Sequence, residues 1–583
     1  MPTITKVLVP NRGEIAVRIF RACREMGIKT VAMYSRIDSN AFHVSFADEA
    51  FFGGETPPSE SYLNISNILD IARRSGSDAI HPGYGFLAEN AEFARAVQDA
   101  GLVWIGPPPR ALEAAGDKIS ARAMASLAGV ASVPGTSRPV DGPQAIGEFA
   151  ARYGWPVAIK ASKGGGGRGF RVVSQAHEVE PAFESAAREA LVSFGDRDLY
   201  LERYLESPRH IEVQVLGDSH GNLVHLGERD CSLQRRHQKL IEESPAPAID
   251  PEIRQSMGEA AVKVARAAGY SSAGTVEFLF EFTNEGPTFW FLEMNTRLQV
   301  EHPVTELVTG KDLVHQMIRI AEGEPLAFDQ SEVTLRGHAI ECRINAENPA
   351  EGFLPQPGEV VSHREPAGPG VRVDAGAGPG SFIPPNYDSL ISKLVCYGES
   401  RQVVIRRTLR ALDEYEITGL TTTIPFHRQV LASKWFAEGA FSTRTVERDL
   451  DLSALPVERT TRPPSGHRER MVSVELEGRR YELLFTHASD PELLRTKPSP
   501  PDISSAHVHA GMGETITAPM QGTIVKLLVE DGAAVRSGEA IMVLEAMKME
   551  NQIVSHSDGW VRFRVGQGQT VSVGTLIAVI ETG

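Results

Sequence analysis

The chain has 583 residues, which is too long for one hydrophobic core, so several domains are expected. Its composition, 42% hydrophobic and 23% charged residues, is that of a globular protein. The formal net charge of −16 argues against nucleic acid or an anionic membrane as the main partner.

Cysteine usage and the start of the chain favour a reducing compartment. The four cysteines lie far apart and show no CxxC spacing, so neither a disulfide framework nor a zinc site is predicted. The first residues lack the apolar block of a signal peptide, and no stretch approaches the roughly 20 apolar residues of a membrane helix. We therefore expect a cytoplasmic protein.

The N-terminal residues alternate strand and helix patterns, which predicts a parallel α/β sheet. Short apolar runs predict four strands, at residues 7–9, 30–34, 79–80 and 103–105. Apolar residues at helical spacing follow the first of them, from Ile15 to Cys23. Glycine- and proline-rich loops follow the strand ends, and in open α/β sheets the ligand lies at that edge.

A run of four successive glycines lies within residues 162–169. It is not a P-loop, because no GxxxxGK[ST] pattern is present. Backbone N–H groups of such a run can approach phosphate oxygens, although a flexible linker would have the same composition. Strands predicted at 156–160 and 170–173 favour a hairpin whose glycine tip closes over a nucleotide.

Two strand patterns on either side of Glu285 predict an antiparallel hairpin centred on that residue. In this register Glu277 faces Glu293, whereas Phe278 pairs with Leu292 on the core face. Two opposed carboxylates repel each other, and hard oxygen ligands so placed suit Mg²⁺. The alternative is a pair of solvated glutamates on an exposed face.

Polar residues continue after this hairpin. Asn295 adds a neutral oxygen ligand, and Arg297, Gln299 and Glu301 follow at a spacing of two, which puts them on one face of an extended segment. An arginine, an amide and a carboxylate can bind a small oxyanion and place a base beside it. A charged sheet surface is the alternative, and the basic run at 234–239 could equally be a solvated face.

The C-terminal third changes character. The pattern of residues 335–448 indicates a further α+β unit. Residues 453–470 and 487–512 are rich in Pro, Ser, Thr, His and Arg, which is typical of a linker. Within the linker, alternating apolar residues at 472–476 and 481–485 predict a β-hairpin.

Residues 513–583 contain an internal repeat, in which Gly538 recurs as Gly574, 36 residues later. Both halves are rich in strand-forming residues, which predicts a small β-sandwich with quasi-two-fold symmetry. Lys548 falls at the turn that joins the halves.

A protruding turn suits a group carrier, because the attached group is exposed and can swing toward distant sites. The Lys548 amine can be acylated, although most lysines at a hairpin turn are simply exposed to solvent. The flanking Met547 and Met549 argue against the ordinary reading, because apolar exposure at a turn is costly.

Several motifs of the chain resemble those of a known family. Ala546-Met547-Lys548-Met549 resembles the signature of biotin carboxyl carrier domains, whereas lipoyl domains usually carry Asp-Lys-Ala at this turn. Residues 4–448 resemble biotin carboxylase, a member of the ATP-grasp ligases. The full chain is similar to the α subunits of actinobacterial-type acyl-CoA carboxylases. The matching motifs are Asn11 to Ala16, His81 to Phe86, Gly116-Asp117-Lys118, Glu228 to Ser232, Gln234 to Lys239, and Glu293 to Pro303.

The resemblance implies a multidomain α/β and α+β fold. Its parts would be a Rossmann-like (pre-ATP-grasp) domain at 1–114, an ATP-grasp domain with a glycine-rich lid at 115–334, the C-terminal domain of biotin carboxylase at 335–448, a linker with a β-hairpin at 449–512, and a lipoyl-like biotinyl β-sandwich at 513–583.

The resemblance also implies residue roles. Lys548 would carry covalent biotin. ATP would be contacted by Lys118, Lys160, Gly165, Gly166, Glu202, His210, Gln234 and His237. Mg²⁺ or Mn²⁺ would be held by Glu277, Glu293 and Asn295. Bicarbonate would be bound by Lys239, Arg297, Gln299 and Val300. The catalytic set would be Glu301, Arg343, Lys239 and Arg297. Glu301 would be the base that acts on bicarbonate, giving carboxyphosphate, and Arg343 would bind biotin and stabilise its enolate.

One position departs from the family pattern. Lys163 stands where the bacterial single-domain enzymes usually have glycine, and we assign it no role.

The resemblance implies partners as well. No carboxyltransferase domain fits into the chain, so a separate β subunit would pass the carboxyl group to acetyl- or propionyl-CoA, with the hairpin at 471–485 as a candidate docking element. Biotin protein ligase would attach the biotin, and an oligomeric α/β complex is expected, without nucleic acid or membrane. Two alternatives remain: a split carboxylase acting on pyruvate, urea or 3-methylcrotonyl-CoA, and a biotin-bearing scaffold with a degenerate ATP site.

Overall fold

The computed structural model describes most of the chain, and every structural statement below concerns these residues. They are 3–116, 118–136, 138–161, 170–194, 197–236, 238–283, 286–452, 455, 470–476, 479–485, 513–520, 522–546, 549–571 and 574–581.

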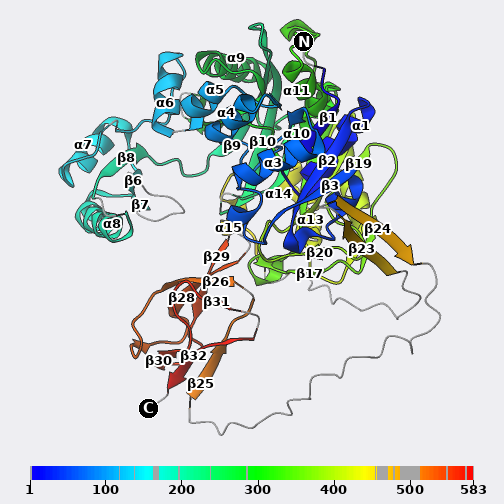
Figure 1. The fold of residues 1–583 in the computed structure, drawn as a ribbon. Helices are drawn as coiled ribbons and strands as arrows, with labels where there is room; N and C mark the ends of the chain where they lie inside the picture. Colours follow the sequence, from blue (N-terminus) through cyan, green and yellow to red (C-terminus); the bar gives the residue numbers. More distant parts are fainter. Residues whose placement is uncertain are drawn as a thin grey trace, which may run out of the picture.

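The N-terminal part is a parallel sheet covered by helices, as predicted (Figure 1). Its parallel strands are β1 (Lys6–Val9), β2 (Lys29–Ser35), β3 (Glu49–Gly54), β4 (Ala79–Ile80) and β5 (Val103–Trp104). Its helices are α1 (Gly13–Glu25), α2 (Phe42–Phe46), α3 (Ile65–Ser75), α4 (Ala91–Asp99) and α5 (Pro109–Gly116). The apolar stripe of α1 is buried, and its members Ile15 and Cys23 belong to the core that this sheet shares with α11 (Leu313–Ala321).

The four strands predicted here are all present, whereas β3 was missed. Its sequence begins with a glutamate and ends in two glycines, so the apolar run is only Ala50, Phe51 and Phe52. Glycine is normally depleted in strands.

A smaller layer projects from the body beside α6 (Lys118–Leu127) and α7 (Gln144–Tyr153) (Figure 1). It is a three-stranded sheet of β7 (Phe170–Val173), β6 (Val157–Ala161) and β8 (Leu199–Arg203), backed by α8 (Val179–Phe194). The predicted pairing of the strands that flank the glycine run is confirmed, since Lys160 pairs with Phe170. The glycine run itself, with Lys163, lies outside the described residues.

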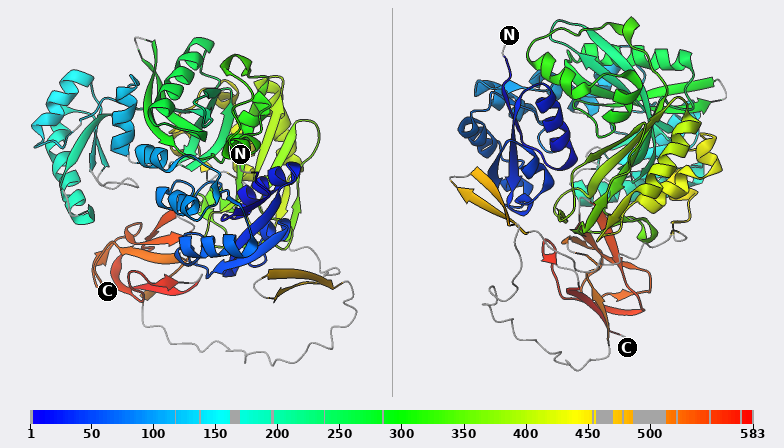
Figure 2. Two further views of the ribbon diagram at one scale, coloured as in Figure 1. Left: turned by 45° about the horizontal axis from the view of Figure 1, so that its top comes forward. Right: turned by 90° about the vertical axis from the view of Figure 1, so that its right-hand side faces the viewer.

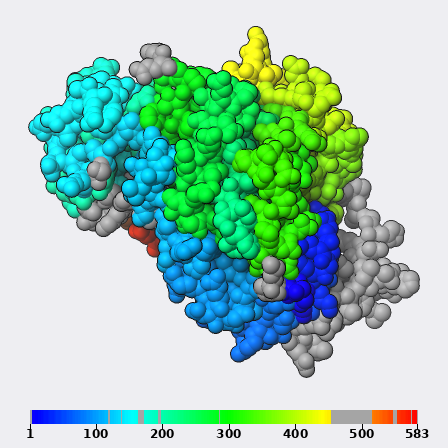
Figure 3. Space-filling model, turned by 90° about the horizontal axis from the view of Figure 1, so that it is seen from above, coloured from blue at the N-terminus to red at the C-terminus, as the bar shows by residue number. Residues whose placement is uncertain are grey.

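The centre of the molecule is one eight-stranded sheet. Its order is β13 (Gly286–Asn295), β12 (Ser272–Thr283), β9 (Arg209–Gly217), β10 (Leu223–Arg235), β11 (Gln238–Ser244), β14 (His338–Asn345), β21 (Leu390–Gly398) and β19 (Val371–Ala375). The helices α9 (Pro251–Ala267), α10 (His302–Thr309), α12 (Arg401–Glu414), α13 (Ile424–Leu431), α14 (Lys434–Ala437) and α15 (Thr445–Arg448) lie around it. Seen from above, the green central part lies between the cyan projecting layer and the yellow part of the chain, around residue 400 (Figure 3).

The α+β unit predicted at 335–448 does not build its main sheet alone. Its strands β14, β21 and β19 extend the preceding sheet, because β14 pairs with β11 through Ile241 and Cys342. Shorter pairs complete the unit: β15 (Glu347–Asn348) with β16 (Leu354–Pro355), β17 (Gly358–Glu359) with β20 (Phe382–Ile383), and β18 (Ser362–Arg364) with β22 (Glu416–Thr418). The domain boundaries given above stay predictions.

The hairpin of β12 and β13 confirms one predicted pair and corrects another. Glu277 faces Glu293 as predicted, but Phe278 pairs with Phe291 and not with Leu292. A bulge between Glu277 and Phe278 shifts the register, so the hairpin is not centred on Glu285. A bulge leaves one extra residue on one strand, which a count of residues from the turn does not anticipate.

The C-terminal part is the predicted β-sandwich. One four-stranded sheet contains β25 (Gly513–Thr517), β32 (Leu576–Glu581), β30 (Gly559–Phe563) and β27 (Ala534–Val535). The other contains β29 (Met549–Val554), β28 (Ala540–Ala546), β26 (Gly522–Leu527) and β31 (Thr570–Val571). Figure 2 shows this domain beneath the body of the molecule. Lys548 lies outside the described residues, between β28 and β29.

The hairpin predicted in the linker is present as β23 (Arg470–Leu476) and β24 (Arg479–Phe485). It joins the edge of the N-terminal sheet, where Arg479 on β24 pairs with Phe51 on β3. The sheet order therefore becomes β23-β24-β3-β2-β1-β4-β5, with β23 outermost.

Candidate active site

One buried lysine connects three carboxylates at the centre of the eight-stranded sheet. Lys239, on β11, donates to Glu212 Oε2 and Glu301 Oε1 at 2.6 Å and to Glu277 Oε1 at 3.1 Å. The side chain of Lys239 is only 11% exposed. The sheet explains part of this convergence, because Glu212 on β9 pairs directly with Glu277 on β12.

Burial and charge act against each other in this cluster. Burial favours the neutral form of Glu277, but Lys239 and His210 hold the pKa of that carboxyl below its usual range. Burial opposes ionisation of Glu301 as well, yet Lys239 and Arg343 hold its pKa well below the usual value. Both carboxylates are therefore ionised at neutral pH.

Arg343 holds the second oxygen of Glu301. From β14 its Nη2 donates to Glu301 Oε2 at 2.9 Å, and its Nε donates to Glu242 Oε1 at 2.6 Å. Burial raises the pKa of Glu242 to about 7, although Arg343 opposes that shift. Each oxygen of Glu301 thus faces a different cation, and the carboxylate, 0% exposed, is fixed in place.

The segment before Glu301 lies against the same cluster. Arg297 Nη1 donates to Gln299 Oε1 at 2.9 Å, and Gln299 Nε2 donates to Glu277 Oε1 at 3.4 Å. The carbonyl of Val300 accepts from Lys393 Nζ at 2.7 Å. The predicted common face of these residues therefore points into the site and is not a charged sheet surface.

One of the predicted metal ligands, Glu277, lies in a buried group of possible ligand atoms. Glu277 is 4% exposed, so the reading as solvated glutamates is wrong for this residue. Asn295 Nδ2 donates to Glu277 Oε1 at 2.8 Å, and His210 Nε2 lies 2.9 Å from Glu277 Oε2. One ligand atom each of His210, Glu212 and Glu277 lies within 4.8 Å of the others. Two buried carboxylates and a histidine nitrogen this close together could hold a divalent cation, whereas Asn295 turns its amide nitrogen, not its oxygen, toward Glu277.

The predicted nucleotide contacts fall into two groups. Lys160 on β6 donates to Glu202 on β8 at 2.5 Å, and Arg122 donates to the other Glu202 oxygen at 2.7 Å. His210 and Gln234 belong instead to the eight-stranded sheet, where Gln234 pairs with Lys239. The hydrogen bonds of the described residues do not join the Lys160 pair to the Lys239 cluster.

Other predicted contacts cannot be placed. Gly165, Gly166 and His237 lie outside the described residues, and Lys118 begins α6 without a described side chain.

Glu212 was missed by the sequence analysis, although the sequence carries a signal for it. His210, Glu212 and Gln214 alternate with apolar residues along β9, so one face of this buried strand is polar. Arg229, fully buried, pairs with Glu212 and donates to Gln214 at 2.7 Å. A polar stripe at a spacing of two within a strongly apolar strand indicates an internal polar cluster.

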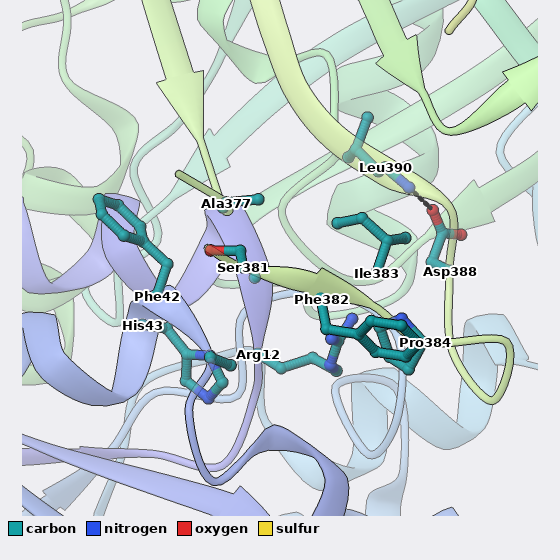
Figure 4. Close-up of a pocket in the computed structure, with 13 residues that line it drawn as sticks. Arg12, Phe42, His43, Ala377, Ser381, Phe382, Ile383, Pro384, Asp388 and Leu390 are labelled. Atoms are coloured by element: carbon teal, nitrogen blue, oxygen red, sulfur yellow. Dashed lines mark hydrogen bonds between the residues drawn. The ribbon is translucent and has the colours of Figure 1, made fainter. Parts of the chain in front are cut away.

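A pocket lies elsewhere, between the N-terminal part and the 335–448 unit (Figure 4). It is lined from one side by Arg12, Phe42 and His43 and from the other by a segment around Phe382 and Asp388. The predicted site residues do not line it.

Comparison with known proteins identifies the parts of the chain. Family models match as the N-terminal domain of biotin carboxylase at 3–112, the ATP-binding domain of the carbamoyl-phosphate synthase L chain at 117–328, the C-terminal domain of biotin carboxylase at 341–448, and a biotin-requiring enzyme domain at 514–580. The fold and these matches define an ATP-grasp biotin carboxylase with a biotinyl domain.

Full-length relatives narrow this class. The chain is 46% identical to the biotin-dependent acyl-coenzyme A carboxylase alpha3 subunit of Mycobacterium leprae, over 99% of both chains. It is 38% identical to the human mitochondrial propionyl-CoA carboxylase alpha chain, over 99% of this chain and 92% of that one. The chain therefore belongs to the family of acyl-CoA carboxylase α subunits, in which biotin carboxylase and the biotin carrier are fused.

A solved structure supports the same assignment. The biotin carboxylase domain of 2-oxoglutarate carboxylase from Hydrogenobacter thermophilus, in complex with MgADP, ADP and bicarbonate, is 47% identical, covers 77% of this chain and 98% of that one, and has a TM-score of 0.70. The predictions of the fold, of the enzyme class and of biotin, ATP and Mg²⁺ are confirmed. The roles of single residues stay predictions. No helix in the described part of the chain is both long and apolar enough to cross a bilayer.

Proposed function

We propose that this chain carboxylates the biotin on its own Lys548, using ATP and bicarbonate, and that a separate carboxyltransferase β subunit passes the carboxyl group to acetyl- or propionyl-CoA. The observation that carries the first part is the fixed Glu301, which Lys239 and Arg343 hold from two sides. Full-length similarity to two acyl-CoA carboxylase α chains supports the second. An acceptor such as pyruvate, urea or 3-methylcrotonyl-CoA is the alternative, and the β subunit decides between them.

Glu301 acts as the base on bicarbonate. Lys239 and Arg343 hold the pKa of Glu301 well below its usual range, so the carboxylate is ionised at neutral pH and carries no proton of its own. Lys239, Arg297, Gln299 and the Val300 backbone bind the bicarbonate anion. Arg343 sits beside Glu301 and binds the biotin ring, where its charge stabilises the enolate.

The ATP side of the site uses the remaining residues. Glu277, Glu293 and Asn295 hold Mg²⁺, which neutralises phosphate charge when it is bound. This cation would also balance the carboxylates that now surround Lys239, which leaves the lysine for an anionic substrate. ATP is contacted by Lys118, Lys160, Gly165, Gly166, Glu202, His210, Gln234 and His237.

The base is tested by Glu301→Gln. We expect bicarbonate-dependent ATP cleavage, stimulated by free biotin, to fall by about 10²–10⁴-fold, the usual contribution of a general base. The exposed Glu324→Gln is the matched control and should keep the activity of the unmodified chain.

Two outcomes would contradict this proposal. Full activity of Glu301→Gln would remove Glu301 from the role of base. If the unmodified, folded chain lacks bicarbonate-dependent ATP cleavage altogether, the reading as a biotin-bearing scaffold is correct.

The hairpin of β23 and β24 is the proposed docking element for the β subunit. Because β23 is the outermost strand of the N-terminal sheet, its outer edge is suited to pairing with a strand of another chain. Deletion of residues 471–485 should abolish co-purification with the β subunit. Retained binding would show that the contact lies elsewhere.

The remaining expectations complete the proposal. Biotin protein ligase attaches the biotin to Lys548, the α and β subunits form an oligomeric complex, and the protein acts in the cytoplasm. Streptavidin binding that disappears in Lys548→Arg would establish the attachment point.

A further inference from the structure

One contact joins the carrier domain to the body of the enzyme. Leu354, on β16, is partly buried because it packs against the apolar core of the carrier β-sandwich, which includes Ile524, Leu544 and Ile577. Among the described residues in this cluster, Leu354 alone comes from the 335–448 unit.

The hairpin that carries Leu354 begins directly after the strand that carries Arg343. Strand β14 ends at Asn345, and β15 follows at Glu347, to which Asn345 Nδ2 donates at 3.2 Å. The hairpin also reaches the end of β10, because the Arg235 guanidinium lies 5.1 Å from the centroid of the Phe353 ring. The contact with the carrier is therefore attached to two strands that line the site.

The backbone before Leu354 is bent in an unusual way. Gly352 and Phe353 both have left-handed φ angles, of 65° and 60°. A non-glycine residue adopts this conformation only when its surroundings hold it there. Phe353 is held by burial, since it is 2% exposed and packs edge-to-face on Phe426. Phe353 thus packs in the core of the 335–448 unit, while the next residue, Leu354, packs against the carrier.

The carrier lies on one side of the body. Figure 1 shows the carrier domain below α15, and Figure 2 also shows it beneath the body. On α15, Glu447 accepts from the backbone N–H of Arg236 at 2.9 Å, and Arg236 directly follows β10. The carrier therefore lies on the side of the body where β10 ends.

We propose that Leu354 is the docking site of the chain's own carrier domain while its biotin is carboxylated. The bend at Gly352 and Phe353 fixes the position of this docking site relative to Arg343. The inference rests on the proposed function and adds to it the surface that recognises the carrier. Free biotin lacks the β-sandwich, so it does not use this docking site.

The test compares two substrates in one full-length chain. In Leu354→Asp, we expect transfer of labelled bicarbonate to the protein-bound biotin to slow by about tenfold or more, because an apolar contact is replaced by a charge. Bicarbonate-dependent ATP cleavage with free biotin should stay within about twofold of the unmodified chain. Leu354→Met should keep both activities, because it conserves volume and polarity.

Controls separate docking from other effects. Leu63→Asp places the same charge at an exposed leucine, 41% exposed, and should change neither activity. Biotin content is measured by streptavidin binding, so that each rate is expressed per biotin.

Each other outcome overturns the proposal. Unchanged transfer to the protein-bound biotin in Leu354→Asp would show that the carrier docks without this residue. Equal loss of both activities would show that Leu354 supports the site itself. Absence of activity with free biotin in the unmodified chain would instead contradict the proposed function.

Discussion

Lys393 shows how a single residue can connect separate parts of this protein. Its side chain is 0% exposed, and Nζ lies 3.2 Å from Glu14 Oε2 and 3.9 Å from Asp374 Oδ2. The same Nζ donates to the carbonyl of Val300, directly before the proposed base Glu301. Glu14 comes from the Asn11 to Ala16 motif, so this motif supports the site without belonging to it.

Replacing Lys393 with methionine should therefore destabilise the protein. The buried Glu14 would lose its cation, whereas Asp374 would keep Arg372, and breaking a buried ion pair costs about 3–5 kcal/mol in the free energy of unfolding. Urea unfolding followed by tryptophan fluorescence measures this loss. Lys434→Met is the control, because Lys434 is 87% exposed and its pair with Glu438 should contribute less than about 1 kcal/mol. Equal effects of the two changes would contradict the role of Lys393.

Glu347 provides a test of pH dependence. Burial raises the pKa of Glu347 from its ordinary value of 4.5 to about 7, although a hydrogen bond from Ser389 opposes the shift. Below pH 4.5 the carboxyl is neutral in both the folded and the unfolded chain and has no effect on stability. Between pH 4.5 and 7 only the unfolded chain releases the proton, so stability falls, and above pH 7 the full cost is present.

Glu347→Gln should remove this cost. The variant should gain up to about 3 kcal/mol in the free energy of unfolding at pH 8 relative to the unmodified protein, and much less at pH 5. Urea unfolding at the two pH values measures the difference, with the exposed Glu359→Gln as control. A gain that is the same at pH 5 and pH 8 would rule out a raised pKa as the cause.

At the level of elements, the repeat in the carrier domain is the clearest case in which sequence predicts structure. Gly522 and Gly559 are equivalent positions, and each approaches a backbone carbonyl. A Cβ would lie 2.4 Å from the Glu545 oxygen at Gly522 and 2.6 Å from the Glu581 oxygen at Gly559. Glu545 and Glu581 are themselves equivalent in the repeat, so both halves keep glycine for the same steric reason.

Alanine at either glycine should weaken the sandwich. A methyl group that close to a carbonyl forces the strands apart, and such overpacking costs about 1–3 kcal/mol. Amide hydrogen exchange in β28 and β32 of the full-length chain should accelerate about tenfold or more. Gly566→Ala is the matched control, because its Cβ would meet nothing within 4 Å. Unchanged exchange in both glycine variants would show that the strands adjust without cost.

Other elements show where sequence reasoning ends. Next to the turn the predicted register is wrong by one residue. The bulge in β13 offsets that error before the Glu277–Glu293 pair, so this predicted pair is present. The bulge itself is a tertiary feature without a local pattern. Strand β3 was missed since its short apolar run is bounded by a charge and two glycines. Glu212 could have been found from the polar stripe on β9, whereas the convergence of three carboxylates on Lys239 depends on the sheet order.

At the scale of the whole molecule, the enzyme and its substrate domain share one chain. The tether holds the carrier at an effective concentration of about millimolar, whatever the dilution. The rate of carboxylation of the protein-bound biotin, per chain, should therefore not change when the protein is diluted.

A mixture of two variants should behave differently. Glu301→Gln supplies biotin without the base, and Lys548→Arg supplies the base without biotin, so carboxylation in the mixture requires two chains to meet. Its rate should fall in proportion to concentration on dilution, measured by transfer of labelled bicarbonate. A mixture as fast as the unmodified chain at every dilution would show that loading occurs between chains.

The sheet that runs from β13 to β19 has a consequence for how such enzymes can be rearranged. Two of the residues that would bind nucleotide, His210 and Gln234, and the arginine that would bind biotin, Arg343, belong to one continuous sheet, joined through β11 and β14. If two related genes recombined near residue 335, β11 of one protein would have to pair with a β14 that evolved beside the β11 of the other. We expect these two halves to be inherited together, whereas the β-sandwich, which forms its own sheets, is the module that can be exchanged.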